Sequence, residues 1–445
     1  MNFQVLVGDF MCSDKNFWFP IIGCALIHWS LGIAGTFGNT VPYVASYMLL
    51  HGNSNLSIGT VCWIECFFIL FQGGANYLYP IIEHIIGFRS GLAIGFLFCT
   101  VGLLVSYLSL SSYLFYLFGY SVLYAVGNGI LFASTSELLL NSYSTNVRSK
   151  IIGLIWIFRG ASMSILPSIQ SSFVNPNNHN SYFVLSGSKL FGSLSLLEKV
   201  PKLMNLTLLF SAAFQLLGVT ILILRSKHLK TVQRQGYAIN KGFSAVYMIF
   251  GSESLILLWL ITFLTWPCIE YIQVFWKVHG MINTGLGDLQ LTRISCIVTV
   301  LQTLFRVFWG VFGQLAGHFN CICALSIILV MGIILLIFPV IEGLSTFQYT
   351  LGYLLVSIAQ SGNSAVYPAT ILNHYSQFNK VELFIYLFSA KITSCIFFCI
   401  LTNATTRIFS INYSLVPLLI FSLGSFFLSF VLKDIKSNQM EKSKE

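Results

Sequence analysis

The chain has 445 residues, of which 56% are hydrophobic and 8% are charged, and its formal net charge is +9. This composition excludes an ordinary soluble domain. The apolar runs are about 20–25 residues long, enough to cross a bilayer as a helix, whereas a large soluble core would show shorter runs broken by charges. The sequence therefore predicts a polytopic helical membrane protein in contact with lipid. The positive charge needs no nucleic-acid partner, because most basic residues fall in predicted loops and tails.

Twelve apolar segments follow one another along the chain, and we expect each to form a transmembrane helix. They cover residues 18–47, 57–82, 88–110, 113–141, 150–172, 203–224, 252–275, 294–316, 321–341, 347–372, 381–402 and 412–432. No basic region precedes the first apolar segment, so we expect no cleavable signal peptide. The predicted fold class is an all-α membrane protein.

The polar stretch between the sixth and seventh segments divides the chain nearly in half. It carries five basic residues. We predict an N-terminal six-helix bundle over 1–224, a cytoplasmic linker over 225–250, a C-terminal six-helix bundle over 251–432 and a cytoplasmic tail over 433–445.

Basic residues also predict the orientation. Of the 23 Lys and Arg, 14 fall in segments that are cytoplasmic if the N-terminus is inside, six on the opposite side, and three within the spans. This excess predicts that both termini are cytoplasmic. By these boundaries, Lys277 and Arg293 belong to an outer loop. The plasma membrane and an organellar membrane are both open as locations.

Three basic residues lie deep within apolar segments, which is unusual for a membrane protein. Arg306 interrupts LQTLFRVFWGVFGQLAGH, and in a helix from about Ile294 to Ala316 it would lie about 18 Å along. Arg159 and Lys391 each lie about 14–15 Å along their own segments. A charge at such depth costs roughly 2.5–3.5 kcal/mol on insertion scales. We therefore expect these three cations to line a polar cavity that binds an anionic group.

A weak internal repeat supports two related halves. An offset of 232 residues places Arg159 on Lys391, and an offset of 234 places Gln72 on Arg306 and His84 on His318. Such a repeat predicts a pseudo-twofold axis along the membrane normal. Coincidence in a chain of low complexity is the alternative.

The loops after predicted helices 2 and 8 share glycines and charges. Glu83 and Arg89 fall in YPIIEHIIGFRSG, and Gly310 and Gly313 fall in FRVFWGVFGQLAGHF. Small residues there would let helices approach closely, and the charges would pair at a cytoplasmic gate. A tight turn with solvated charges is the alternative.

Together these residues resemble a known family. Arg306 followed by Phe308-Trp309-Gly310, and Lys391 preceded by Ser389-Ala390, resemble helices 8 and 11 of the oxalate:formate antiporter branch of the major facilitator superfamily. Related monocarboxylate transporters share the helix 8 arginine. The resemblance implies two pseudo-symmetric six-helix bundles, alternating access, and an Arg and a Lys that hold the substrate carboxylates. The second loop departs from the family, since Gln314 and His318 stand where an acid would follow the glycine.

Coupling is a separate question. The proton-coupled monocarboxylate transporters carry an aspartate one turn before the arginine, and this chain has Gln302 there. Glutamine cannot titrate, so we expect anion exchange. His28 and Glu65 are possible proton sites that would change this expectation. Glu65 and Glu137 are alternatively counter-ions of Arg159 or partners of each other's helices.

We therefore expect a carrier of small organic anions, monocarboxylates or short dicarboxylates, that works by alternating access. Arg306 and Lys391 would bind substrate, with Arg159 and Gln72 as further candidates. No catalytic, cofactor or metal grouping stands out among the residues, and the 11 cysteines show no metal or disulfide spacing. We expect a monomer that is not an enzyme. A non-transporting sensor on a transporter fold, or a carrier of amino acids or other carboxylate metabolites, is the alternative.

Overall fold

The computed structural model describes residues 15–52, 56–143, 145–179, 183–185, 188–225, 252–337, 346–375, 380–408 and 411–442. Nearly all of the predicted linker, from residue 226, and the loop 338–345 lie outside the described residues. Helices dominate the described part, and a short antiparallel hairpin pairs β1 (Phe183–Leu185) with β2 (Ser188–Leu190).

The helices follow the predicted order of spans. They are α2 (Lys15–Leu31), the 3-10 segment η1 (Gly32–Thr36), α3 (Phe37–His51), α4 (Ile58–Ile86), α5 (Phe88–Leu108), α6 (Tyr113–Leu117), the π-helical segment η2 (Phe118–Tyr124), α7 (Ala125–Ser142), α8 (Thr145–Val174), α9 (Leu194–Leu197), α10 (Lys199–Arg225), α12 (Glu253–Asn283), α13 (Asp288–Ala316), α14 (His318–Ile337), α16 (Thr346–His374), α17 (Lys380–Ile408), the 3-10 segment η5 (Ile411–Ser414) and α18 (Leu415–Lys442).

Eleven helical segments of the described part are long and apolar enough to cross a membrane. The tenth predicted span corresponds to α16, which has 29 residues but is more polar than the eleven. Its middle carries Gln360, Ser361, Asn363 and Ser364. Of these, Gln360 and Ser364 form hydrogen bonds with Gln302 and Arg306 of α13.

Residue contacts divide the chain into two compact units. Unit 1 comprises Met1–Thr36, Phe67–Leu166 and Pro201–Gln235, and unit 2 comprises Phe37–Cys66, Pro167–Val200 and Gly236–Glu445. The helices α4 and α8 therefore contribute one part to each unit. Each unit is described by itself below.

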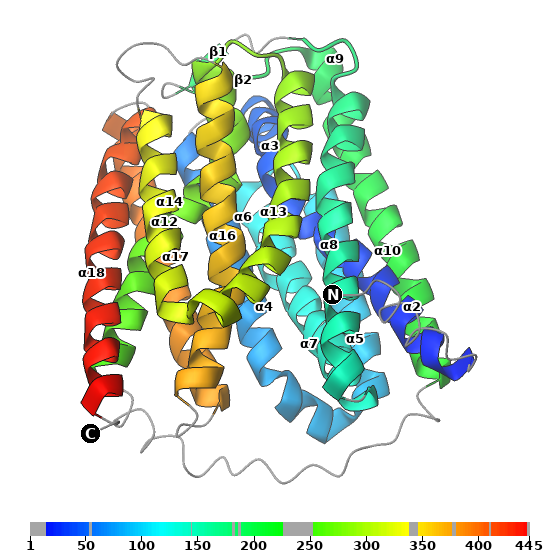
Figure 1. Cartoon of the computed structure of the whole chain (residues 1–445). Coiled ribbons are helices and arrows are strands. Elements are labelled where there is room, and N and C mark those ends of the chain that lie inside the picture. The colour runs from blue at the N-terminus through cyan, green and yellow to red at the C-terminus, as the bar shows by residue number, and fades with distance from the viewer. Residues whose placement is uncertain are drawn as a thin grey trace. The chain divides into compact units, whose positions relative to one another are not determined.

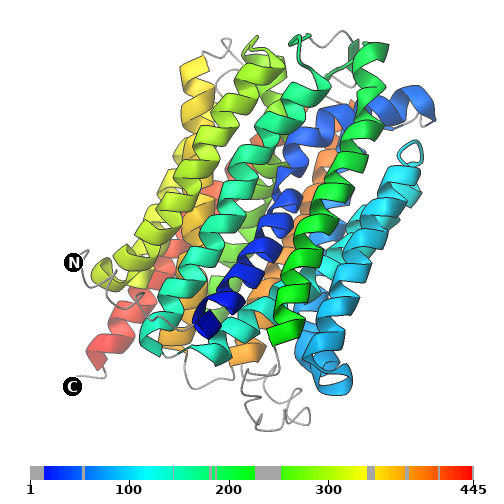
Figure 2. The same cartoon turned by 90° about the vertical axis from the view of Figure 1, so that its right-hand side faces the viewer.

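Unit 1 is held together by helix pairs with polar and small residues between them. Figure 2 shows α2 alongside α10, and the hydroxyl oxygens of Ser30 and Ser211 lie 2.9 Å apart across this pair. Tyr79 and Ile130 belong to a buried apolar cluster between α4 and α7. Short hydroxyl side chains of this kind allow close packing of helices that lipid does not drive together.

Unit 2 has its apolar core between the C-terminal helices. Leu258, Ile322, Val366, Leu387 and Leu432 belong to one buried cluster, which joins α12, α14, α16, α17 and α18. Figure 1 shows α14 between α16 and α18, with which it makes extensive contact. This core holds the helices that carry the deep charged residues.

Several helix boundaries in unit 2 differ from the prediction. Helix α18 continues to Lys442, through most of the predicted tail 433–445. The sequence predicts a loop over 276–293, but α12 continues to Asn283 and α13 begins at Asp288. Lys277 and Arg293 are therefore helical residues, and the loop prediction for them is wrong. The polar residues after Phe275 extend α12 because they find buried partners.

A proline interrupts the hydrogen-bond ladder of α12. Pro267 has no N–H group, so the carbonyl of Phe263 loses its partner within the helix. The hydroxyl group of Ser394 on α17 donates to that carbonyl at 2.9 Å. A side chain of the neighbouring helix thereby satisfies a backbone group that lipid could not satisfy.

Candidate functional site

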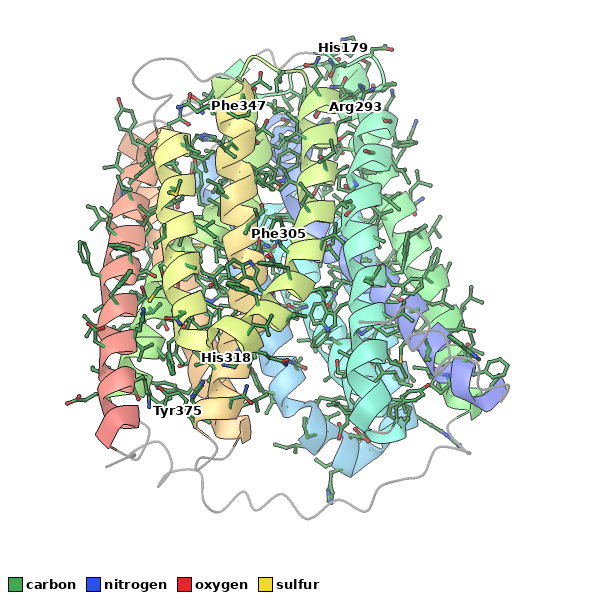
Figure 3. All side chains as sticks on the ribbon, in the orientation of Figure 1. His179, Arg293, Phe305, His318, Phe347 and Tyr375 are labelled. Carbon is green, nitrogen blue, oxygen red and sulfur yellow. The ribbon has the colours of Figure 1, made fainter. Side chains whose placement is uncertain are left out.

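Arg306 lies farther from the middle of its helix than the sequence predicts. Because α13 begins at Asp288, Arg306 is about 27 Å along a helix of about 42 Å, or about 6 Å beyond its midpoint. Its Nε donates to the hydroxyl of Ser364 at 3.1 Å. Figure 3 shows its neighbour Phe305 between the labelled residues Arg293 and His318. The guanidinium is thus oriented by α16.

The contact between Arg306 and Ser364 is one of three polar contacts with the same spacing. Ser295 and Tyr353 share a hydrogen bond of 3.0 Å, and the Gln302 amide donates to Gln360 at 2.6 Å. Each partner lies 58 residues after its mate, so α13 and α16 run parallel and in constant register. These contacts explain the polarity of α16.

Lys391 lies about 17 Å along α17, a helix of about 42 Å. Its ammonium group is 4.1 Å from the centroid of the Trp266 ring and 4.0 Å from Oε1 of Glu270, both on α12. The side chain of Lys391 is 23% exposed and that of Glu270 is 2% exposed. The ion pair is long, so the ammonium retains capacity for another acceptor.

Glu65 belongs to the same group of charges. It interacts electrostatically with Glu270 and Lys391. The sequence named Arg159 as a possible partner of Glu65, whereas the charged groups that act on Glu65 are Glu270 and Lys391. The sequence placed Glu270 near a helix end, but it is the eighteenth residue of a 31-residue helix. Sequence reasoning missed Glu270 because it placed the end of α12 at residue 275.

Arg159 and His28 share one environment within unit 1. The guanidinium carbon of Arg159 lies 5.5 Å from the Phe132 ring and 5.6 Å from the Trp156 ring. His28 is 5.6 Å from the same Phe132 ring, and its Nε2 lies 2.9 Å from the Thr135 hydroxyl. Arg159 and His28 thus lie against the same aromatic ring.

Gln72 contacts α7, and the contact resembles that of Arg306. Its amide donates to Asn128 at 2.6 Å. Gln72 and Asn128 lie 56 residues apart, while Arg306 and Ser364 lie 58 apart. The second and fourth spans thus pair as the eighth and tenth do, which agrees with the internal repeat.

The glycines in the two predicted gate loops differ in whether their backbone or surroundings require a glycine. Gly87 and Gly317, the turn glycines in the two loops, have φ of 81° and 86°, so both need a residue without a side chain. A Cβ at Gly310 would meet no described atom within 4 Å, and one at Gly313 only the His318 ring. Close helix approach at Gly310 and Gly313 was therefore a wrong prediction. Glu83 and Arg89 flank Gly87 at the end of α4 and the start of α5.

The second turn leads into a pair of histidines. The rings of His318 and His374 have centroids 5.3 Å apart, and the Asn373 amide lies 3.3 Å from Nε2 of His318. Figure 3 labels His318 and Tyr375 at this end of α14 and α16. Side-chain hydrogen bonds thus replace the acid expected after the glycine.

A second charged cluster in unit 2 was missed by the sequence. The ammonium of Lys277 lies 2.5 Å from Oδ1 of Asp288, with side-chain exposures of 0% and 1%. It also donates to Asn39 at 2.8 Å, Ser171 at 2.9 Å and Tyr43 at 3.0 Å. The ammonium group therefore has four oxygen atoms around it in a buried site.

The same cluster also satisfies its carboxylate. Oδ2 of Asp288 accepts hydrogen bonds from the Tyr43 hydroxyl at 2.5 Å and from the Asn175 amide at 2.9 Å. The cluster joins α3, the end of α8, α12 and α13. Gly38 permits this junction, because a Cβ there would lie 2.0 Å from the carbonyl oxygen of Gln273.

Metal and disulfide chemistry have no observed basis in the described residues. No group of three or more His, Cys, Asp or Glu among them could hold a metal ion. The ten cysteines that the structure describes are free thiols. The charged residues within the helices contact hydroxyl, amide, aromatic and carboxylate groups instead.

No protein-family model matches the chain. The chain is similar to two solved structures along nearly its whole length. The xylose transporter XylE of E. coli, in a partially occluded inward-open conformation, superposes with a TM-score of 0.65 at 11% identity, covering 94% of this chain and 99% of that one. A D-xylose–proton symporter superposes with a TM-score of 0.64 at 12% identity, covering 94% of this chain and 96% of that one.

The chain has the major facilitator fold. It is therefore an integral, multi-pass membrane protein. At 11% and 12% identity the likeness concerns the fold alone. The substrate of the two structures does not transfer to this chain.

The chain is also similar in sequence to part of a carrier of another kind of substrate. The apicoplast pyruvate carrier 2 of Toxoplasma gondii is 26% identical over 156 residues. The match covers 35% of this chain and 24% of that carrier. The chain thus spans about a quarter of the length of this relative, and its activity is considered below only as support for a proposal.

Proposed function

We propose that the chain is a secondary carrier of small organic anions that works by alternating access. The observation that carries this proposal is the presence of Arg306 and Lys391 within the spans of a transporter fold. Arg306 contacts Ser364, and Lys391 contacts Trp266 and Glu270. A cation in hydrocarbon is costly, so a function that uses its charge is favoured.

The two cations suit a carboxylate. The planar fork of Arg306 matches a carboxylate in two parallel hydrogen bonds, while Lys391 is a more mobile point charge. Monocarboxylates and short dicarboxylates fit this pair, and similarity to a pyruvate carrier supports the former. A neutral sugar would have no use for the cations. Amino acids and other metabolites with a carboxylate are alternatives within the same proposal.

The remaining assignments belong to the same proposal. Two six-helix bundles would rock about the linker 225–250, with both termini cytoplasmic and the carrier a monomer. Arg159 and Gln72 are further substrate contacts in it, and Glu83, Arg89, Gly310 and Gly313 belong to the gate. Exchange is the expected mode if no titratable group accompanies the anion. His28 and Glu65 are the proposed proton sites if one does.

Substitution of Arg306 tests the proposal in proteoliposomes by counterflow of labelled pyruvate, lactate and oxalate. Arg306→Lys keeps the charge but loses the fork, so we expect a loss of about tenfold or more, since one charge-assisted hydrogen bond is involved. Arg293→Lys is the matched control, because Arg293 is an exposed residue of the same helix. Counterflow at the wild-type rate in Arg306→Ala would contradict the assignment.

A sensor on the same fold is the second candidate. It would bind the anion without moving it. Binding measured by calorimetry in detergent, with no counterflow of any anion in proteoliposomes, would identify the sensor and reject the carrier.

A further inference from the structure

The group of Glu65, Glu270 and Lys391 has an imbalance of charge. It contains two carboxyl groups and one ammonium group, drawn from α4, α12 and α17 of unit 2. If all three groups were ionised, one negative charge would have no counter-ion inside the membrane. Buried charge is stable only where it is paired and hydrogen-bonded. A further cation is therefore needed at this place in at least one state of the protein.

The hydrogen bonds of the group point the same way. Neither oxygen of Glu270 has a hydrogen bond of normal geometry with a described residue, and the same holds for Oε2 of Glu65. The Cys395 thiol faces Glu270, but a thiol is a weak donor. The nearest cation, Lys391, stays 4.0 Å from Glu270. Oxygens that lack strong donors are suited to accept a proton.

The surroundings favour a proton over a metal ion. The charged or titratable groups that interact with Glu270 are Lys391, Glu65, Cys395 and Cys66, and those that interact with Glu65 are Glu270, Lys391, Cys395 and Cys66. The thiols of Cys66 and Cys399 lie in hydrogen-bond contact beside them. A hard metal cation takes about six oxygen ligands, and this site offers two carboxyl groups among thiols and an indole. A proton needs only one oxygen.

The geometry points to Glu65 and Glu270 as a proton-binding site that is loaded together with the anion. This inference rests on the proposed function, in which the anion binds Lys391. An anion on Lys391 competes with Glu270 for the ammonium group and leaves the two carboxyl groups with less compensation. One proton from the aqueous side, bound to either carboxyl group, replaces that compensation and leaves with the anion on the other side.

Linkage makes the effect reciprocal. If the anion raises proton affinity by some factor, the proton raises anion affinity by the same factor. The expectation of exchange rested on Gln302, which cannot titrate. Its side-chain amide donates a hydrogen bond to Gln360. The inference therefore replaces exchange by cotransport of one proton with each monocarboxylate. Of the two possible proton sites named from the sequence, it selects Glu65 over His28 and adds Glu270 to it.

The experiment uses the full chain in proteoliposomes and labelled pyruvate. With an inside-alkaline gradient of one pH unit, one-to-one coupling accumulates pyruvate about tenfold. The double variant Glu65→Gln with Glu270→Gln should lose this accumulation. Glu253→Gln is the matched control, because Glu253 is an exposed carboxylate on α12. Protein-free vesicles correct for diffusion of the protonated acid.

The outcomes separate the two proposals. Counterflow without gradient-driven accumulation in the wild type, or tenfold accumulation that persists in the double variant, would overturn the proton site and leave the carrier intact. Accumulation that follows a sodium gradient instead of pH would overturn it as well. No counterflow of any tested anion in the wild type would reject the carrier itself.

A second measurement covers a double variant that fails to fold. The detergent-solubilised wild type should take up about one proton per bound pyruvate, as followed with a pH indicator in weak buffer. Either single variant, Glu65→Gln or Glu270→Gln, should take up less. Binding of pyruvate by the wild type without proton uptake would overturn the inference.

Discussion

Two lysines within the helices of unit 2 differ in how completely the protein compensates their charge. Lys277 is fully buried, and its ammonium has Asp288 at 2.5 Å and three further oxygen acceptors. Lys391 is partly exposed, and its carboxylate partner is 4.0 Å away. The first charge is fully compensated by the protein, whereas the second has room for a ligand. Completeness of compensation, more than depth, therefore distinguishes a structural charge from a candidate binding charge.

Breaking the satisfied pair should have the largest effect. Lys277→Met leaves Asp288 buried without a cation, and we expect the free energy of unfolding to fall by about 3–5 kcal/mol. Thermal unfolding in detergent measures it. The matched substitution Lys391→Met should cost about 1 kcal/mol or less, because that pair is long and partly solvated. Equal costs for the two substitutions would abolish the distinction between the lysines.

A pair of glycines tests the packing around the Lys277–Asp288 cluster. Gly38→Ala places a methyl group against the backbone of Gln273 and must move Asn39 away from Lys277, so we expect a cost of about 1–3 kcal/mol in unfolding free energy. Gly310→Ala meets no described atom within 4 Å and should stabilise α13 by roughly 0.5–1 kcal/mol. Thermal midpoints of the two variants give the comparison. A harmless Gly38→Ala would mean that the junction does not depend on close approach.

The smallest effect on stability is expected at Glu270, the long-range partner of Lys391. Glu270→Gln removes a long ion pair but also removes a negative charge without strong donors, so the unfolding free energy should change by less than about 1 kcal/mol. Asp288→Asn provides the contrast, since that carboxylate has Lys277, Tyr43 and Asn175 around it. Denaturation midpoints of both variants measure the difference. A large loss in Glu270→Gln would indicate that this glutamate is structural.

Signals that are local in the chain were read correctly from the sequence. The length of the apolar runs predicted the long helices, including the more polar α16, and single charges within them drew attention to Arg306 and Lys391, whose role in binding stays a prediction. The internal repeat found Gln72, whose contact with Asn128 resembles that of Arg306 with Ser364. Such signals need no knowledge of what lies across from a residue.

Signals that depend on partners were not readable. The sequence ended the seventh helix before Lys277 because a lysine at that point looks solvated. The helix continues because Asn39, Tyr43 and Ser171, which are more than 100 residues away in the chain, surround the ammonium. The same error of boundary hid Glu270. A run of hydropathy shows the cost of burying a charge but not the group that offsets it.

The proline of α12 has a mechanical consequence. The carbonyl of Phe263 is bonded to Ser394 of α17, so α12 can flex at Pro267 without losing any hydrogen bond of its own. Trp266 and Glu270, the two neighbours of Lys391, lie on either side of this joint. A shift of the Lys391 ammonium toward a bound anion would change its contacts with Trp266 and Glu270 at the same time. A change of charge at Lys391 would therefore act on the two segments of α12 that meet at Pro267.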